Sequence, residues 1–493
     1  MAGTPPRSTR PAPGADEGAQ VGDAGARSRY PEGADRPAPV ATHVWRLLAL
    51  ALPSTIAQLG AMLLMVVDVL MLGRLGVAAL DSASLGRVWA LGTLVAGMGL
   101  VFGIDPVATQ AWGSGNRRRY EGALGSGIVV ALASSVPIGA LWLVAGPSLR
   151  LLGQDAALTG GASRFVLAQL PGLPFLLVFF AVKQYLQARG SVLPAMWVTL
   201  LGNAINVLLN WMLIFGRGGA PALGIVGSGL ATSLTHAFLA LALLGWMRWR
   251  RDPADWRGAW QRGRRRHELG EVLGYGWPVA LQLMLEVWTF QVATLLAGRL
   301  GAIALAAHTA AISLASVTFT IPFGVSMAAV VRVGNLVGAR ARRDAQRAAW
   351  VALGAGAGVM GVSAVGFWLG RFELPKLFSA EPAVVAAAAA ILPIAAAFQV
   401  FDGLQVVGCG ILRGMGQTRP AAAFNVLGYY GLALPLAWWL GFRLRLGLPG
   451  IWWGLALGLA SVALLLLAWI RRYGPATMPA GAGRQPAAAR ESR

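Results

Sequence analysis

The chain has 493 residues, of which 56% are hydrophobic and only 12% are charged, and its mean hydropathy is +0.61. This composition excludes an ordinary soluble enzyme and indicates a polytopic helical membrane protein. The formal net charge of +21 would suggest a nucleic-acid partner in a soluble protein. In so apolar a chain we expect no nucleic acid, and interpret the excess as loop charge that faces anionic membrane lipids.

Both ends of the chain are predicted to be disordered. Residues 1–42 and 474–493 are rich in Pro, Ala, Gly and Arg and poor in large apolar side chains. Such segments cannot bury enough apolar surface to fold. Residues 1–42 also lack the apolar core of a signal peptide, so we expect no cleavage there.

Twelve segments are apolar over the roughly 20 residues that a membrane-spanning helix needs. We therefore predict an all-α integral membrane protein with twelve transmembrane helices. In chain order the segments cover about 45–72, 85–109, 121–146, 163–187, 193–216, 224–248, 270–297, 303–330, 346–369, 384–411, 421–441 and 449–471.

The arginines fall mainly on one side of this topology. The loops between the second and third, sixth and seventh, and eighth and ninth predicted helices are rich in arginine, whereas the opposite loops are poorer. By the positive-inside rule, the arginine-rich loops and both termini are cytoplasmic. We expect a multi-pass protein of the cytoplasmic (inner) membrane.

The sequence repeats itself at a fixed offset. GRLG at 73–76 recurs at 298–301, and the match continues without a gap across two predicted helices. The same offset pairs Pro53 with Pro278, Leu80 with Leu305 and Gly113 with Gly338. Each half holds six predicted helices, an even number, so the halves run parallel, as in many secondary transporters. We assign 43–248 to an N-lobe, 249–269 to a cytoplasmic linker and 270–473 to a C-lobe.

Three acids lie deep inside the apolar stretches of the predicted helices: Asp68, Glu286 and Asp402. A charge at membrane depth costs roughly 2.5–3.5 kcal/mol on insertion scales, so an intramembrane acid is a functional-site hypothesis by default. The alternative is that each acid only forms a hydrogen bond with a neighbouring helix. We interpret two further charged residues as structural: Asp105 as a local acid, and Lys183 as a side chain that reaches the membrane interface.

Four segments resemble the multidrug and toxic compound extrusion (MATE) family, especially its NorM-like branch. They are LPSTIAQLGAMLLMVVDVLMLGRLG, LLGNAINVLLNWMLIFG, YGWPVALQLMLEVWTF and AFQVFDGLQVVGCGILRGMGQTRPAA. The resemblance covers nearly all of 45–472. It implies twelve helices in two six-helix lobes arranged as a V, and cation-coupled export of organic cations and other drugs.

In the N-lobe, the resemblance places Asp68 at the position of the family's helix-1 acid, and Asn206 and Asn210 at the asparagines beside it. The topology puts all three in the outer halves of their helices, with the asparagines one turn apart on one face. Burial favours a neutral carboxyl, whereas amide donors favour the anion. We therefore predict an N-lobe coupling site that takes up and releases a proton; the alternative is that the amides only join helices.

In the C-lobe, Glu286 and Asp402 match the family's acids tied to cation binding. Two acids in one lobe can hold a cation between them or share a proton; alternatively they face different cavities. The family often has a tyrosine four residues before the second acid, where this chain has Phe398. A hydroxyl ligand is thus lost, although Na⁺ at Glu286 and Asp402 remains the one metal site we consider.

Side chains near the acids can form an adaptable wall for substrates. Methionines adapt to varied ligands, and aromatic faces attract cations. Ordinary helix packing is the stronger interpretation for any one of them. The candidates for the substrate cavity are Gln282, Met284, Trp288, Phe398 and Met65.

These features predict an antiporter that exports organic cations or amphiphilic drugs by alternating access, as a monomer. H⁺ or Na⁺ would be the coupling ion, without another cofactor, and we expect no enzyme activity. The sequence has no GxxxxGK[ST] motif for ATP. A flippase for a lipid-linked precursor would need a basic cavity for pyrophosphate. An intramembrane transferase would need clustered acids or metal ligands. We therefore rank both alternatives below the antiporter.

Overall fold

The computed structural model describes residues 38–250 and 256–478, which form helices and no strands. Within these residues, twelve helical segments are long and apolar enough to cross a membrane, which confirms the predicted number. They are Val40–Gly73 (α1), Val77–Gly113 (α2, α3), Arg117–Leu143 (α4), Ala156–Ala188 (α6, α7), Leu193–Phe215 (α8), Ile225–Trp249 (α9), Arg266–Arg299 (α11), Ala302–Gly338 (α12), Arg342–Leu369 (α13), Pro382–Met415 (α14), Thr418–Arg443 (α15, α16) and Gly447–Thr477 (α17, which is Gly447–Tyr473, and a short 3₁₀ helix).

Several helices extend beyond their predicted apolar stretches. The clearest cases are α12, predicted to end near 330 but continuing to Gly338, and α13, which begins at Arg342 rather than near 346. Hydropathy detects the apolar core of a bilayer, whereas the hydrogen bonding of a helix continues into polar residues.

Three spanning segments contain breaks or changes of helix type. The second passes from α2 (Val77–Val101) to α3 (Ile104–Gly113), and the fourth passes from α6 (Ala156–Gln169) through Leu170–Gly172 to α7 (Leu173–Ala188). In the eleventh, α15 (Thr418–Asn425) and α16 (Leu434–Trp438) alternate with π-helical turns at Val426–Ala433 and Trp439–Arg443. A short helix, α5 (Ala145–Leu151), follows α4 outside these segments.

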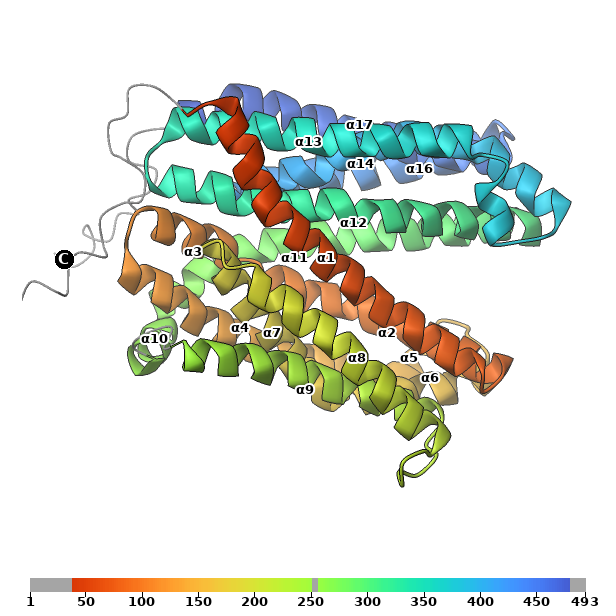
Figure 1. Ribbon diagram of the computed structural model, residues 1–493. Helices are drawn as coiled ribbons and strands as arrows, with labels where there is room; N and C mark the ends of the chain where they lie inside the picture. Colours follow the sequence, from red (N-terminus) through yellow and green to blue (C-terminus); the bar gives the residue numbers. More distant parts are fainter. Residues whose placement is uncertain (1–37, 251–255, 479–493) are drawn as a thin grey trace, which may run out of the picture.

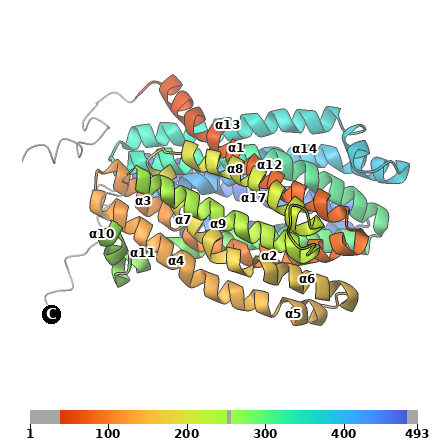
Figure 2. The same ribbon diagram turned by 60° about the horizontal axis from the view of Figure 1, so that its bottom comes forward.

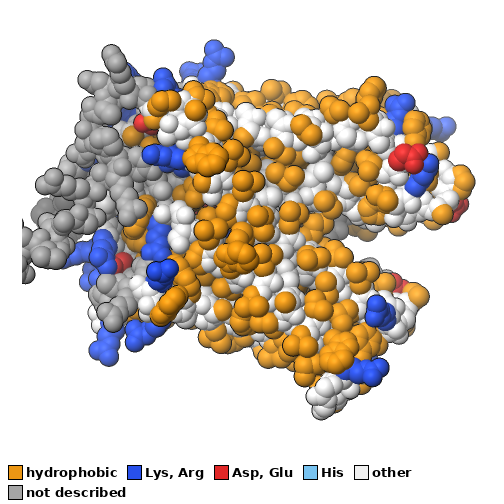
Figure 3. Space-filling view, in the orientation of Figure 1, with side chains coloured by type: hydrophobic (Ala, Val, Ile, Leu, Met, Phe, Trp, Pro, Cys, Tyr) orange, Lys and Arg blue, Asp and Glu red, His pale blue; other side chains and the backbone are white. Residues whose placement is uncertain are grey.

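The spanning helices form two lobes that meet at one end and diverge at the other (Figure 1). In the N-lobe, α4, α7 and α9 lie side by side (Figure 2). Figure 3 shows an open cleft between the lobes at one end, and many of the Lys and Arg side chains gather at the opposite end. We call these the open end and the closed end. The fold is the predicted V-shaped arrangement of two six-helix lobes.

The first helix of each lobe begins against the other lobe. Leu47 and Ala51 of α1 belong to a core built mainly by α12, α13 and α14, and His43 Nε2 lies 3.4 Å from Asp344 Oδ1 of α13. Conversely, Val272 of α11 belongs to the core of the N-lobe, together with Ile104. Each of the two helices ends in the core of its own lobe and so passes from one lobe to the other, as expected for a duplicated unit.

Glycines allow α3 and α12 to meet closely at this end. A Cβ added to Gly113 would overlap the carbonyl oxygen of Asn335, and a Cβ added to Gly338 would overlap the carbonyl oxygen of Gln110. The offset of the sequence repeat converts the first pair into the second. The contact between the lobes thus follows the internal symmetry of the chain. Because the two helix backbones approach each other so closely, glycine is required at both places.

Three segments outside the predicted spanning helices contain helical structure. Helix α1 begins at Val40, inside the predicted tail, because its first turn continues the helix that the apolar residues start. The predicted linker contains the helix α10 (Trp256–Gly263), held on α4 by the Arg262–Glu121 ion pair at 2.8 Å and by the hydroxyl of Ser126, which donates to the Gly263 carbonyl. Pro475–Thr477 forms a short 3₁₀ helix. Residues 1–37 and 479–493 of the predicted tails lie outside the described residues.

Candidate cation-coupling sites

Asp68 lies on α1 in the N-lobe, with only 4% of its surface exposed. The side-chain nitrogen of Asn210, from α8, donates to Asp68 Oδ1 at 2.6 Å and to Asn206 Oδ1 at 2.9 Å. One amide therefore bridges the acid and the second amide, because four residues make one helical turn. The structure brings together the three side chains predicted for this site.

Two residues near Asp68 were missed by the sequence analysis. The hydroxyl of Thr232, from α9, donates to Asp68 Oδ2 at 3.4 Å and also to the carbonyl of Ser228 at 3.0 Å. Arg87, from α2, interacts electrostatically with Asp68 and donates to the backbone carbonyl of Met65 at 3.4 Å. Arg87 lies inside a predicted membrane span, so its charge was a usable signal. A threonine in a membrane helix carries no such signal.

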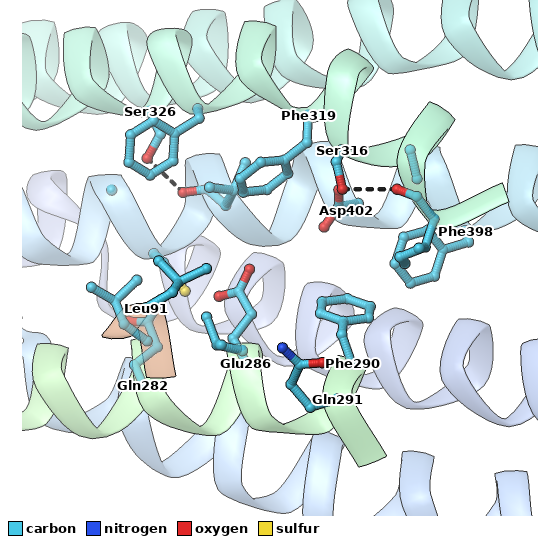
Figure 4. A pocket seen from close by; sticks show the side chains of 18 of the residues that line it. Leu91, Gln282, Glu286, Phe290, Gln291, Ser316, Phe319, Ser326, Phe398 and Asp402 are labelled. Carbon is cyan, nitrogen blue, oxygen red and sulfur yellow. Dashed lines mark hydrogen bonds between the residues drawn. The ribbon is translucent and has the colours of Figure 1, made fainter. Parts of the chain in front are cut away.

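Glu286 of α11 and Asp402 of α14 line one cavity of about 510 Å³ in the C-lobe, so they do not face different cavities. Figure 4 shows Glu286 directed into this space. The two carboxyl groups are near enough to interact electrostatically. Phe290 and Phe398 form part of the wall, and their rings pack edge to face with centres 6.1 Å apart. The cavity thus combines acids with aromatic surface.

Behind this cavity lie polar groups that the sequence did not reveal. Gln405, next to Glu286, donates from Nε2 to Asn425 Oδ1 at 2.9 Å. Tyr429 is buried behind Phe290, with its hydroxyl unpaired within the described chain, and both acids act on it electrostatically. Asn425 and Tyr429 come from the eleventh spanning segment, whose sequence has no charged residue at this depth to mark it.

The predicted substrate residues divide between two environments. Gln282 and Phe398 line the C-lobe cavity, whereas Met65, Met284 and Trp288 do not. Trp288 instead lies against Gly92 of α2, where an added Cβ would come within 3.3 Å of the indole ring. The three side chains outside the cavity project from other faces of their helices, which adjacency in sequence could not distinguish.

Two structural assignments from the sequence were wrong. Asp105 of α3 is not a local acid, because its Oδ2 lies 3.2 Å from Nε of Arg413 on α14, in the other lobe. Lys183 of α7 does not reach the membrane interface: it is buried near Asp105 and interacts with it electrostatically. Each of these two residues has an oppositely charged partner inside the protein, and this pairing explains why both are buried. The sequence could not show which charges meet.

The MatE family model matches the chain twice, over residues 53–212 and 278–439. The two matches begin at Pro53 and Pro278, a pair of positions that the internal repeat also relates. The chain belongs to the MatE family. This result confirms the resemblance found in the sequence, and indicates a transporter rather than an enzyme.

Full-length relatives agree with this assignment. A probable multidrug resistance protein NorM from Bradyrhizobium diazoefficiens is 35% identical over 431 residues, covering 85% of this chain and 91% of that protein. The multidrug resistance protein MdtK from Yersinia pestis is 32% identical over 440 residues, covering 86% and 94%. The crystal structure of the eukaryotic MATE transporter AtDTX14 has a TM-score of 0.81 at 24% identity, covering 89% of this chain and 97% of that one.

Proposed function

We propose that this protein is a multidrug efflux antiporter, which exports organic cations and amphiphilic compounds in exchange for H⁺ or Na⁺. The observation that carries the proposal is the pair of acids, Glu286 and Asp402, in the wall of a cavity that is otherwise largely apolar and aromatic. Relatives named as multidrug resistance proteins support the same substrate class.

The C-lobe cavity suits a lipophilic cation. Its acids supply negative charge in a medium of low dielectric constant, where electrostatic attraction is strong. The rings of Phe290 and Phe398 offer faces that attract cations without demanding one ligand shape. A cation that enters would compete with the coupling ion for the two acids, and this competition would link drug release to ion uptake.

The N-lobe site suits a proton. In the structure, groups that point at Asp68 are donors: the Asn210 amide and the Thr232 hydroxyl. Asn210 Oδ1 and Asn206 Nδ2 are buried without a partner within the described chain. If both amides rotate, Asn210 Oδ1 accepts from a protonated Asp68 and from Asn206 Nδ2. The chain of amides therefore satisfies either protonation state, which a reversible proton carrier requires.

The orientation in the membrane follows from charge. The closed end carries arginines such as Arg118 and Arg343, which the positive-inside rule assigns to the cytoplasm. We propose that both termini are cytoplasmic, that the cleft opens outward from the inner membrane, and that one chain suffices for transport. Alternating access would then require the lobes to close at the open end and to separate at the closed end.

The test is efflux of a fluorescent organic cation from loaded cells and from membrane vesicles, under an imposed H⁺ gradient and then a Na⁺ gradient. We expect wild-type efflux under at least one gradient, and a loss of about tenfold or more in Asp68→Asn at equal expression. Asp81→Asn, at an exposed acid on α2, is the matched control. Absence of efflux by the wild type under both gradients would overturn the proposal and favour a lipid-precursor flippase.

A further inference from the structure

Arg413, near the end of α14, reaches across the boundary between the lobes. Its Nε lies 3.2 Å from Asp105 Oδ2, and its guanidinium lies 5.2 Å from the centre of the Phe102 ring. Both partners belong to the N-lobe. On its own lobe, Arg413 contacts the thioether of Met327 at 3.8 Å. The buried charge of a C-lobe arginine is thus compensated by the N-lobe.

The ion pair lies within the seam that joins the lobes at the closed end. Next to Arg413, the carbonyl of Gly414 accepts from Gln110 Nε2 at 3.0 Å, a second contact between α14 and α3. The close approach of α3 and α12 at Gly113 and Gly338 continues the same seam. The closed end therefore cannot open unless Arg413 leaves Asp105.

Asp105 keeps other partners when Arg413 leaves. Gln184 Nε2, from α7, donates to Asp105 Oδ1 at 2.7 Å. Lys183, the preceding residue on α7, is 8% exposed and interacts electrostatically with Asp105. Since α3 and α7 both belong to the N-lobe, these groups stay together during any rigid motion of the lobes. Lys183 is therefore placed to compensate Asp105 in an inward-open state.

We propose that Asp105, Arg413 and Lys183 form a partner-exchange lock at the closed end. In the outward-open state, Arg413 pairs with Asp105 and holds the lobes together. When the lobes separate there, Lys183 becomes the cation that pairs with Asp105, and Arg413 faces the inner opening. A buried acid left without a cation would be strongly destabilising. Exchange of partners avoids that cost and keeps the two states similar in free energy, as repeated cycling requires.

The lock also contacts the candidate substrate site. Arg413 lines the C-lobe cavity together with Asp402. The two residues are eleven positions apart on α14, which is about three helical turns, so they share one face of that helix. A ligand bound between Glu286 and Asp402 would therefore contact the same face of α14 that carries Arg413. This inference rests on the alternating access proposed above.

The experiment measures the distance between the two tips of the open end by spin labelling of the full-length protein in lipid nanodiscs. The labels are placed at Gln154→Cys and Ala380→Cys, two exposed positions in loops of the N-lobe and the C-lobe. The background is Cys409→Ser, since Cys409 is the single cysteine of the chain. A short distance reports closure of the open end, which accompanies opening of the closed end.

Substitution of the two cations should shift the distances in opposite directions. Arg413→Gln removes the lock and should raise the ratio of short to long distances about tenfold, since each tenfold change is about 1.4 kcal/mol. Asp105→Asn removes the partner of both cations, so it should shift the ratio less than Arg413→Gln does. Lys183→Met should lower it below that of the wild type. Arg117→Gln, which breaks an ion pair of 2.8 Å within α4, is the matched control and should leave the ratio unchanged.

The directions in which the two substitutions shift the distance ratio decide whether the lock exists. If Arg413→Gln and Lys183→Met shift the ratio in the same direction, or if Arg413→Gln behaves as the wild type, the lock is overturned. Because the distances are measured without drug or ion gradient, loss of transport does not enter the result. A wild type that gains a short distance on addition of drug, with Arg413→Gln matching it both before and after the addition, would sink the lock and leave the transporter proposal standing.

Discussion

The N-lobe and the C-lobe repeat one set of helices but carry their acids at different places. The offset of the repeat pairs Asp68 with Ala293 and Glu286 with Ala61, so neither acid has an acidic counterpart. The surroundings differ as well. Asp68 is enclosed by an amide and a hydroxyl that donate to it, whereas Glu286 and Asp402 line a cavity of about 510 Å³.

This difference indicates how a duplicated fold can divide two tasks, the binding of a proton and the binding of a larger cation, between its halves. An enclosed acid surrounded by donors has room for a proton but not for a drug. Two acids beside a cavity with aromatic walls can attract a larger cation or a metal ion. What the lobes retain in common is a first helix that begins against the other lobe, and the glycine contacts of the closed end.

The largest effect that separates the two sites should be on drug binding. We expect the double substitution Glu286→Gln and Asp402→Asn to weaken binding of tetraphenylphosphonium about tenfold to a hundredfold, because it removes the negative charge from the cavity. Asp68→Asn should leave the affinity within about twofold of the wild type. Intrinsic tryptophan fluorescence of the purified protein, titrated with the cation, measures both affinities.

The opposite pattern would break the comparison. If Asp68→Asn loses as much affinity as the double variant, the drug site extends into the N-lobe and the division of tasks is wrong. An uncharged compound of similar shape serves as the control, since its binding should respond little to either substitution.

A second prediction concerns the amides around Asp68. Asn210→Leu should destabilise the protein by about 1–3 kcal/mol, because it leaves the buried carboxylate with one donor fewer. It should also reduce efflux driven by a proton gradient. The matched control is Asn203→Leu, on the same helix, whose amide has no hydrogen-bond partner within the described chain. Thermal unfolding in detergent and vesicle efflux measure the two effects.

The interpretation fails if the two leucine variants behave alike. Equal loss of efflux would mean that the amides of α8 act only through packing. Equal stability, with efflux retained by Asn210→Leu, would mean that Asp68 does not depend on the donor that lies 2.6 Å from it.

The sites were predictable where burial of a charge is costly and helix geometry sets the depth. Those rules singled out Asp68, Glu286 and Asp402, whereas Asn206 and Asn210 came from the resemblance to the MATE family, at a depth that helix geometry allows. The twelve helices and their division into two lobes followed from apolar length, arginine placement and the repeat, which are properties of the chain itself, whereas the V-shaped arrangement was implied by the family resemblance.

The remaining features depend on contacts between distant helices. The ion pair of Asp105 with Arg413 needs the register of α3 against α14, which no local pattern contains. Thr232, Asn425 and Tyr429 are polar residues that membrane helices tolerate at low cost, so their positions beside the acids carried no energetic signal. Trp288 was predicted to line the cavity because it is close to Glu286 along the chain. It lies against Gly92 of α2 instead.

The smallest predicted effect concerns the ion in the C-lobe. Phe398 lines the cavity with the two acids but has no oxygen to offer. In Phe398→Tyr, an added hydroxyl should strengthen Na⁺ binding by roughly 0.5–1.5 kcal/mol, the usual net value of one polar contact. The measurement is the thermal shift of the purified protein in NaCl against choline chloride. Phe401→Tyr, at a position outside the cavity lining, is the control.

The sign of this small change discriminates between ions. If Na⁺ occupies the acid pair, the stabilisation by NaCl should grow in Phe398→Tyr and stay constant in Phe401→Tyr, because only the first hydroxyl can reach the ion. If both variants match the wild type in NaCl while drug binding still competes with protons, the pair is a proton site. The C-lobe would then differ from the N-lobe in the space beside its acids, and not in the ion that they bind.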